Sequence, residues 1–185
     1  RADLTPKLSK DAKVGRKPGK YKWFEIQDST EYYDEFEKPK IVFRGLSVKG
    51  EFPYVEEPLY VNAPASIISG GSPYLSGILN SKLVWFFIVN KCPLIRGNFR
   101  RLYNYQIEKI PIAQADRQME GMINSKVCTT IALNKRLNEI GDKKTDERAR
   151  IEEEIKKTDA EIDELVYKLY GITESEKKII EESLR

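Results

Sequence analysis

The fold of this chain is decided by residues 72–112, which read SPYLSGILNSKLVWFFIVNKCPLIRGNFRRLYNYQIEKIPI. The first half has the pattern of a helix, because Ser72 can cap the first turn and Pro73 suits the next position, where its missing N–H costs nothing. Apolar side chains fall on nearly every face of residues 75–89, and a helix without a polar stripe must be covered on all sides. We therefore expect one central buried helix, too short and too interrupted by the polar run 80–82 to cross a bilayer.

The second half of this segment alternates hydrogen-bond donors with aromatic side chains. An Arg side chain can donate to guanine O6 and N7 together, and an Asn side chain can bond the N6 and N7 atoms of adenine. The aromatic rings can either pack in the core or stack beside bases, and the sequence leaves both open. The donors are Arg96, Asn98, Arg100, Arg101, Asn104 and Gln106, and the aromatic residues are Phe99, Tyr103 and Tyr105.

Charge divides the chain into two parts. Residues 1–113 have a formal net charge of +6 and residues 114–185 one of −3, within a total of +3 over 185 residues. A positive first part indicates an anionic partner, with nucleic acid as the first candidate. The same boundary separates a strand-rich body, residues 1–113, from a helical extension, residues 114–185.

Histidine is absent, which excludes a Ser/His/Asp triad, a Cys/His pair and a histidine-ligated zinc site. The two cysteines, Cys92 and Cys128, lie in separate segments, as expected of a reduced, cytoplasmic protein rather than a disulfide framework. No signal peptide or membrane span is recognisable, and the chain opens without an initiator Met, which is compatible with a piece of a longer protein. We predict neither a metal site nor a membrane partner.

Short strand patterns succeed one another before the central helix. Alternating or β-branched runs predict strands at residues 21–27, 40–44, 52–55, 59–62 and 66–69. Residues 1–20 have no hydrophobic period and form either an extended lead-in or a basic arm along a phosphate backbone. Residues 28–37 form a surface loop or a short helix. Short turns between strands favour a mostly antiparallel or mixed sheet packed on the central helix, so the predicted fold class is α+β.

Helix formers dominate from residue 114 onwards. An apolar stripe ends at a break at residues 141–144, after which Thr145 can cap the next helix. A heptad seam typical of a coiled coil follows, at Ile151, Ile155, Thr158, Ile162, Leu165 and Leu169. Thr173 and Glu176 form a capping box that opens a last short helix. We expect a long antiparallel helical hairpin, which either packs on itself as a spacer or forms an interface with another domain or subunit.

Four runs of the body and one run of the extension resemble a known family. In the body they are KWFEIQ (22–27), EKPKIV (37–42), LNSKLVWF (79–86) and RRLY (100–103), the last leading to IPI (110–112). These runs are similar to the TaqI-like C-terminal specificity domain, the target-recognition part of adenine-specific DNA methyltransferases and of fused type IIG restriction-modification enzymes. The run EIDELVYKLYGIT (161–173) resembles the helical tail that such polypeptides carry.

The resemblance implies an N6-adenine DNA methyltransferase module upstream, with S-adenosylmethionine as its cofactor. Neither a glycine-rich cofactor loop nor an Asn-Pro-Pro-Tyr motif is present in this chain. Ser72-Pro73-Tyr74 differs from that motif by a Ser in place of Asn and one missing Pro, and Ser72 is better explained as a helix cap. We therefore expect a non-catalytic fragment without a cofactor of its own, and an adenine-specific DNA methyltransferase as the parent enzyme.

The expected function is sequence-specific recognition of double-stranded DNA for such a methyltransferase or restriction-modification enzyme. Cations displace counterions from phosphates, and loop side chains reach base edges in the major groove. Charge and loop position single out, as candidate DNA contacts, Lys17, Lys20, Arg44, Lys49, Arg96, Asn98, Arg100 and Arg101. Two alternatives remain open: one half of a type I specificity subunit, and a protein-interaction module built on the helical hairpin.

Overall fold

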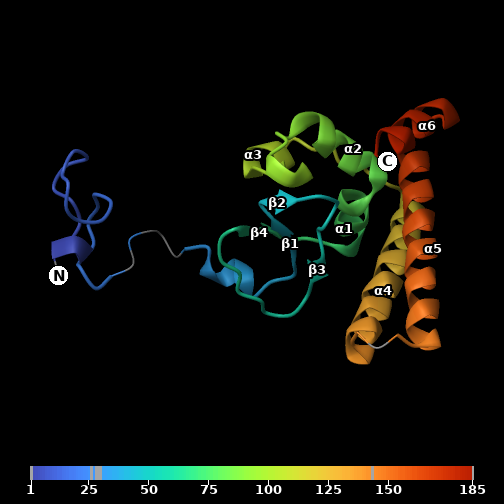
Figure 1. Cartoon of the computed structure of the whole chain (residues 1–185), viewed down its shortest axis with the longest axis horizontal. Helices are drawn as coiled ribbons and strands as arrows, with labels where there is room; N and C mark the ends of the chain where they lie inside the picture. The colour runs from blue at the N-terminus through green and yellow to red at the C-terminus, as the bar shows by residue number, and fades with distance from the viewer. Residues whose placement is uncertain (1, 26, 28–30, 143, 185) are drawn as a thin grey trace. The chain divides into compact units, whose positions relative to one another are not determined.

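Two compact units make up the chain, Arg1–Glu35 and Phe36–Arg185. The computed structural model describes residues 2–25, 27, 31–142 and 144–184. The second unit contains the strands and α-helices that Figure 1 labels, and it carries the candidate interface. Within the described ranges, none of the helices combines the length and the apolar character that crossing a membrane requires.

Arg16 organises the first unit, which begins with a 3-10 turn, η1 (Ala2–Leu4). Its guanidinium donates, at 2.7–3.2 Å, to the backbone oxygens of Leu4, Lys22, Trp23 and Glu25. The strand predicted at residues 21–27 is wrong for the described part of that stretch, which forms turns. The Lys22 N–H bonds the Glu25 carboxylate at 2.8 Å, and the Glu25 N–H bonds the Lys22 carbonyl at 3.0 Å. These groups close a local turn and are therefore not available to a neighbouring strand.

Antiparallel pairing organises the strands of the second unit. The central strand β1 (Lys40–Arg44) lies between β3 (Tyr54–Val55) and β4 (Ala65–Ser69). A second, two-stranded sheet pairs β2 (Leu46–Ser47) with β5 (Arg100–Arg101), which are far apart in the sequence. The predicted α+β class with mostly antiparallel strands is confirmed.

Some of the predicted strand boundaries change. The strand predicted at residues 52–55 shortens to β3, because the Asn80 side chain takes up the N–H and the carbonyl of Phe52, at 2.9 and 3.0 Å. The strand predicted at residues 59–62 is wrong: this stretch is a loop, in which the Leu59 N–H bonds the Phe36 carbonyl at 3.1 Å.

The acidic stretch at residues 28–37 contains one turn of helix. Residues 31–37 are described, and they include the 3-10 turn η2 (Tyr33–Phe36), which agrees with the predicted loop or short helix. Residues 28–30 lie outside the described part of the chain. All of the described residues from 31 to 34 are exposed, as the acidic composition suggests.

The predicted single central helix is two helices, α1 (Pro73–Asn80) and α2 (Lys82–Lys91). Ser81 between them has an extended backbone, with φ −67° and ψ 153°, and its side chain caps α2 by accepting from the Val84 N–H at 3.3 Å. A serine side chain that satisfies an unpaired N–H favours a helix start over continuation of the previous helix. The prediction that this helical segment is buried on all sides is only partly correct, because Trp85 is half-buried whereas Ile88 is fully buried.

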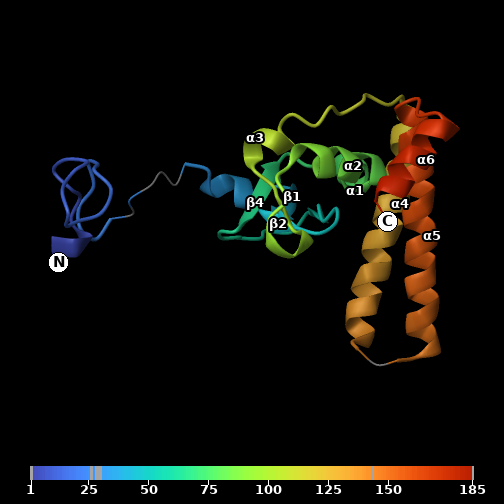
Figure 2. The same ribbon diagram turned by 45° about the horizontal axis from the view of Figure 1, so that its top comes forward.

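The helical hairpin consists of α4 (Arg117–Ile140) and α5 (Asp146–Leu169), followed by the short α6 (Glu174–Ser183). Figures 1 and 2 both show α4 and α5 antiparallel and side by side, with α1 and α2 between the sheets and the hairpin. The predicted caps are confirmed: Thr145 accepts from the Arg148 N–H at 3.1 Å, and Thr173 opens α6 with a capping box. The predicted long hairpin is therefore confirmed.

The body and the hairpin share one hydrophobic core. Ile78 of α1 and Ile88 of α2 lie in the same buried cluster as Ile123 and Val127 of α4 and Val166 of α5. Each large apolar side chain buried in such a core contributes roughly 1.5–3 kcal/mol. The hairpin is thus fixed to the sheets through α1 and α2 (Figure 2).

Two tyrosines fix the linker that leads into α4. The Tyr74 hydroxyl donates to the Ala113 carbonyl at 2.6 Å, and the Tyr170 hydroxyl donates to the Pro111 carbonyl at 2.7 Å and accepts from the Ala113 N–H at 3.0 Å. Burial raises the pKa of both tyrosines, so they stay protonated as these hydrogen bonds require.

Candidate nucleic-acid interface

Residues 93–101 form a short β-hairpin that follows α2, here called the ribbon. The Ile95 N–H bonds the Phe99 carbonyl at 2.7 Å, and the Arg101 N–H bonds the Pro93 carbonyl at 3.0 Å. The second strand of the ribbon includes β5, whose other edge pairs with β2. Because it is paired on both sides, this strand has a fixed position on the second sheet.

The tip of the ribbon is η3 (Arg96–Asn98), a single 3-10 turn. Gly97 and Asn98 have positive φ angles there, 77° and 63°. Glycine adopts this left-handed backbone without a steric penalty, and Asn tolerates it better than most residues. The Asn98 side chain is exposed at the tip. The side chain of Arg96, another predicted contact, lies outside what the structure describes.

Two stacked tyrosines continue the surface beside the ribbon, on the short helix α3 (Asn104–Ile107) and just before it. The Tyr103 and Tyr105 rings lie with their centroids 5.5 Å apart and their planes 20° apart. The Arg101 guanidinium lies 5.3 Å from the Tyr103 centroid, and the Lys109 Nζ lies 5.7 Å from the Tyr105 centroid. Both distances are within the range of cation–π attraction. Arg101, Tyr103, Tyr105 and Lys109 together are called the aromatic stack.

Arg100 anchors the ribbon rather than pointing its whole side chain outward. Its Nη1 donates to the Cys92 carbonyl at 3.2 Å, and the Gln106 Nε2 donates to the Lys91 carbonyl at 2.8 Å. These are carbonyls at the C-terminal end of α2, which have no partner within the helix and carry its negative end charge. The cation of Arg100 therefore stabilises the end of α2 and fixes the base of the ribbon.

Arg44 and Lys49 belong to a different surface. Both pair with Glu51: Arg44 through a hydrogen-bonded ion pair, and Lys49 at 3.8 Å between Nζ and Oε1. Burial alone would raise the pKa of Glu51, but the hydrogen bond and the charge of Arg44 outweigh it and hold that pKa below its usual range. The two cations thus have a carboxylate between them, and they offer less net charge to an anion than the sequence suggests.

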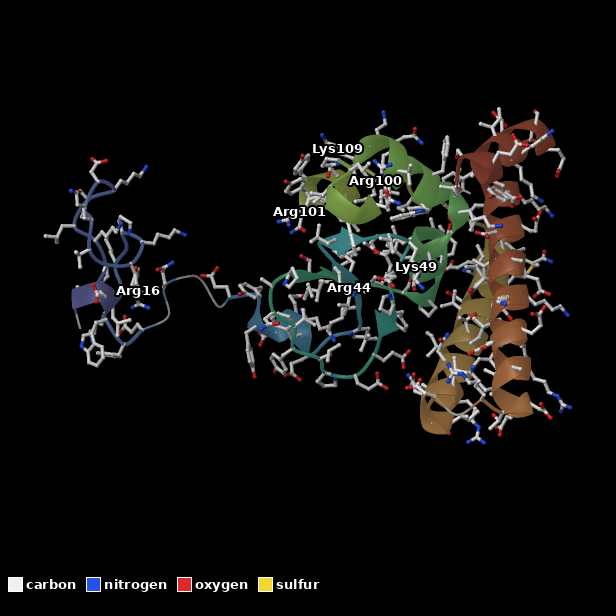
Figure 3. The ribbon with its side chains drawn as sticks, in the orientation of Figure 1. Arg16, Arg44, Lys49, Arg100, Arg101 and Lys109 are labelled. Carbon is white, nitrogen blue, oxygen red and sulfur yellow. The ribbon has the colours of Figure 1, made fainter. Side chains whose placement is uncertain are left out.

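These two cations line a groove of about 880 Å³ between the sheet that contains β1 and the hairpin helices α4 and α5. Asp159 of α5 also lines it, and burial together with the charge of Asp163 raises the pKa of Asp159. Figure 3 shows Arg100, Arg101 and Lys109 around α3 and β2, with Arg44 and Lys49 below them and Lys49 beside α1. The groove carries both signs of charge, whereas the ribbon and the aromatic stack carry mainly positive charge.

Of the predicted contacts, the structure brings Asn98, Arg100 and Arg101 together on the ribbon. Lys17 and Lys20 are exposed residues of the first unit. No Asp or Glu occurs between Glu57 and Glu108, and residues 93–109 have a net charge of +3. An anionic ligand would therefore meet little repulsion along the ribbon and the aromatic stack.

The aromatic stack contains residues that the sequence did not single out as contacts. Lys109 was absent from the candidates, and Tyr103 and Tyr105 were left open between core and surface. Tyr103 is 41% exposed and Tyr105 is 56% exposed. The signal that could have found this surface is the long stretch without Asp or Glu, residues 58–107, in which Arg101, Tyr103 and Tyr105 carry groups suited to an anion or a ring, and which Lys109 follows closely.

The residues that resemble a methyltransferase motif have structural roles. The Ser72 side chain accepts from the Leu75 N–H at 3.2 Å as the cap of α1, and the Tyr74 hydroxyl is bonded to the Ala113 carbonyl. The side-chain hydroxyls of Ser72 and Tyr74 are thus already bonded within the fold, and both residues have structural roles. The thiol of Cys92 is buried, which raises its pKa. Among the described residues, no group of His, Cys, Asp or Glu side chains is arranged to hold a metal ion.

The geometry defines a class of module: an α+β body that presents a cationic ribbon and is joined to a helical hairpin. The family model of the TaqI-like C-terminal specificity domain matches residues 9–112, more than half of the chain. The chain therefore belongs to the family of TaqI-like C-terminal specificity domains, as the resemblance implied. The match ends at the linker that leads into the hairpin.

A solved structure has the same fold. The type IIL restriction-modification enzyme MmeI, solved in complex with DNA, superposes with a TM-score of 0.60 at 12% sequence identity. The match covers 80% of this chain and 21% of that chain, so this chain spans about a fifth of the length of MmeI. Comparison with curated proteins finds no match. At this identity the similarity to MmeI establishes the fold alone.

Proposed function

We propose that this chain is the DNA target-recognition part of a restriction-modification enzyme, with double-stranded DNA as its ligand. The observation that carries the proposal is the membership of residues 9–112 in a specificity-domain family. Two further observations support it: the net positive charge of the ribbon and the aromatic stack, and a fold shared with an enzyme that was solved with DNA.

Phosphate contact is the task best suited to the aromatic stack. The rings of Tyr103 and Tyr105 hold the cations of Arg101 and Lys109 beside them, which limits the freedom that these long side chains would lose on binding. Each cation that neutralises a phosphate releases condensed counterions, and this release drives much of protein–DNA affinity. Such contacts position the protein on the duplex and carry no sequence information themselves.

The chemistry of the parent enzyme is a finer part of the proposal. The family resemblance supports an N6-adenine methyltransferase module upstream, which would hold S-adenosylmethionine and take the target adenine out of the base stack. In that arrangement this chain contributes recognition and no catalytic residue. The surrounding reading frame provides a check: a methyltransferase module on the same polypeptide supports this part, and a long helical spacer followed by a second specificity domain supports a type I specificity subunit instead.

A salt-dependent titration tests the proposal. The whole chain is titrated against fluorescent duplex DNA at about 50 and about 200 mM salt, with fluorescence anisotropy as the readout. If three phosphates are contacted, affinity falls roughly 40-fold between these concentrations. Absence of binding at the lower salt concentration, or binding that is indifferent to salt, would contradict the proposal.

A further inference from the structure

The tip of the ribbon presents groups that the fold itself does not use. Leu94, Ile95 and Phe99 are 57%, 41% and 42% exposed, although each is a large apolar side chain. The Asn98 amide is exposed and forms no hydrogen bond with any described residue. The backbone of the tip is nevertheless held in place. Ile95 and Phe99 flank the tip, and the Ile95 N–H bonds the Phe99 carbonyl at 2.7 Å.

A two-stranded ribbon can enter one groove of duplex DNA. The major groove of B-form DNA is about 12 Å wide and admits a two-stranded β-ribbon, whereas the minor groove is about half as wide. The Arg101 cation lies at the base of the ribbon, beside Tyr103, where it can meet a phosphate at the groove edge. An arginine at the base of the ribbon, together with an exposed amide and exposed apolar side chains around its tip, matches the phosphate edges and the base floor of that groove.

We infer that the ribbon enters the major groove of duplex DNA and that the Asn98 amide reads an adenine there. An Asn side chain can accept from adenine N6 and donate to adenine N7 at once, and an apolar side chain can contact the methyl group of thymine. Ile95 and Phe99 flank the tip and are placed for the second kind of contact. This inference rests on the proposed function and adds to it the specificity-determining residue and the groove.

Exposed apolar residues can also mark a protein-binding surface, so the partner needs an argument of its own. No acidic residue lies between Glu57 and Glu108, and Arg101 at the end of the ribbon and Lys109 beyond it add two cations beside the tyrosine rings. This charge favours a polyanion over a typical protein partner. The left-handed backbone at Asn98 also places an amide, not an apolar group, at the tip.

Selection from a DNA library with a randomised centre tests the inference, with the whole chain as bait and sequencing of the bound duplexes. Asn98→Gly is the main variant, because glycine keeps the positive φ of the tip and removes only the amide. Asn98→Asp replaces the donor by an acceptor. Asn90→Ala is the matched control, since Asn90 lies on α2 and its Nδ2 bonds the Phe86 carbonyl at 2.8 Å.

The wild-type chain is expected to select a motif with a fixed adenine, and Asn90→Ala is expected to select the same motif. Asn98→Gly should lose the preference at that adenine by about 5- to 150-fold and keep the other positions. Asn98→Asp should prefer cytosine there, because a carboxylate accepts from cytosine N4. Circular dichroism of each variant checks that the fold is retained.

A second measurement identifies the groove. Replacing the selected adenine by 7-deazaadenine removes the N7 acceptor, which lies in the major groove. The affinity of the wild-type chain for this DNA should fall by about 5- to 150-fold. The affinity of Asn98→Gly should hardly change. Wild-type binding that is indifferent to the deaza base would overturn the inference, as would a motif unchanged by Asn98→Gly or the absence of any motif.

The two proposals fail in different ways. If the wild-type chain binds no DNA in the titration described above, the proposed function fails and this inference fails with it. If the wild-type chain binds DNA with strong salt dependence but Asn98→Gly keeps the full sequence preference, only the role of Asn98 is refuted.

Discussion

Asn80 bonds the backbone of Phe52 in both directions: the Phe52 N–H donates to Oδ1 at 2.9 Å, and Nδ2 donates to the Phe52 carbonyl at 3.0 Å. Asn80 ends α1 and Phe52 lies two residues before the start of β3, so this pair joins a helix to a sheet. The next two residues continue the connection: Ser81 caps α2, and the Lys82 N–H donates to Asp163 Oδ1 of α5 at 2.8 Å. The LNSK run that carries the family resemblance is therefore the junction of the sheet, the two helices and the hairpin.

Asn80→Ala should destabilise the chain by about 1–3 kcal/mol, because it leaves the N–H of the buried Phe52 without its partner, while the Phe52 carbonyl keeps only the hydrogen bond from the Ser76 hydroxyl at 2.7 Å. Urea unfolding of the variant and the wild-type chain measures the difference. Asn90→Ala is the control and should change stability by less than about 0.5 kcal/mol, since Asn90 is exposed and bonds only its own helix. Equal effects of the two substitutions would show that Asn80 is not a junction residue.

Gly77 sets the distance between α1 and α4. A Cβ atom at this position would lie 2.8 Å from Ile123 Cγ2 and 2.9 Å from Val127 Cγ2, closer than real Cβ contacts. Gly77→Ala is therefore expected to cost about 1–3 kcal/mol through overpacking. Gly121→Ala is the matched control on α4, because nothing lies within 4 Å of its Cβ position, and it should stabilise the helix by about 0.5–1 kcal/mol. Thermal unfolding of both variants should give melting temperatures that move in opposite directions.

Asp163 should make the stability of the chain depend on pH. Burial raises its pKa although Lys82 opposes this, with Lys82 Nζ at 3.5 Å from Oδ2 and at 2.9 Å from Glu181 Oε1. The folded chain then holds the proton more tightly than the unfolded chain, whose Asp pKa is about 3.9. The stability gained from protonation is fully present below the unfolded pKa and is lost as pH rises through the folded pKa.

Asp163→Asn removes this titration and keeps Oδ1 as the acceptor for the Lys82 N–H. We measure the free energy of unfolding in urea at pH values between about 4 and about 7. The value for the variant should rise relative to the value for the wild-type chain as pH rises. The charge of Asp163 also raises the pKa of Asp159, and the loss of this effect in the variant shifts the difference in the same direction. A difference that is constant with pH, or that shifts in favour of the wild-type chain, would contradict the raised pKa.

Local sequence patterns were enough to predict the helical hairpin, whereas the pairing of strands from distant segments was not predicted. The heptad seam and the caps at Thr145 and Thr173 lie within single helices, so the sequence contains all that is needed. The sheet formed by β2 and β5 joins two strands from distant parts of the chain. Each strand has only two residues, which is too short to show a hydrophobic alternation in the sequence. Conversely, residues 21–27 alternate like a strand, yet their described residues form turns closed by Lys22 and Glu25. A strand needs a partner, and one segment alone does not reveal it.

The candidate interface was predicted in part for a similar reason. Charge and loop position were enough to select Arg101 and Asn98, which the structure places on the ribbon. They were not enough to show that Glu51 pairs with Arg44 and Lys49, or that Arg100 caps α2, because each of these partners is set by tertiary contacts. Whether these residues contact DNA stays a prediction.

The salt dependence of DNA binding should identify the cations that meet phosphates. Arg101→Ala/Lys109→Ala is expected to reduce the slope of log K against log salt by about 1.8, since each lost phosphate contact removes about 0.9. Arg150→Ala/Lys168→Ala removes one Arg and one Lys from α5 and should leave the slope nearly unchanged. A larger change in the α5 variant would place the phosphate contacts on the hairpin instead.

Hydrogen exchange with and without duplex DNA tests most directly that the ribbon and the aromatic stack form the DNA-binding surface. Amide exchange is followed by mass spectrometry on the whole chain at low salt. DNA is expected to slow exchange within residues 94–109 and to leave the half of the hairpin next to the turn, residues 130–156, unchanged. Slower exchange confined to the hairpin, with residues 94–109 unaffected by DNA, would contradict this assignment.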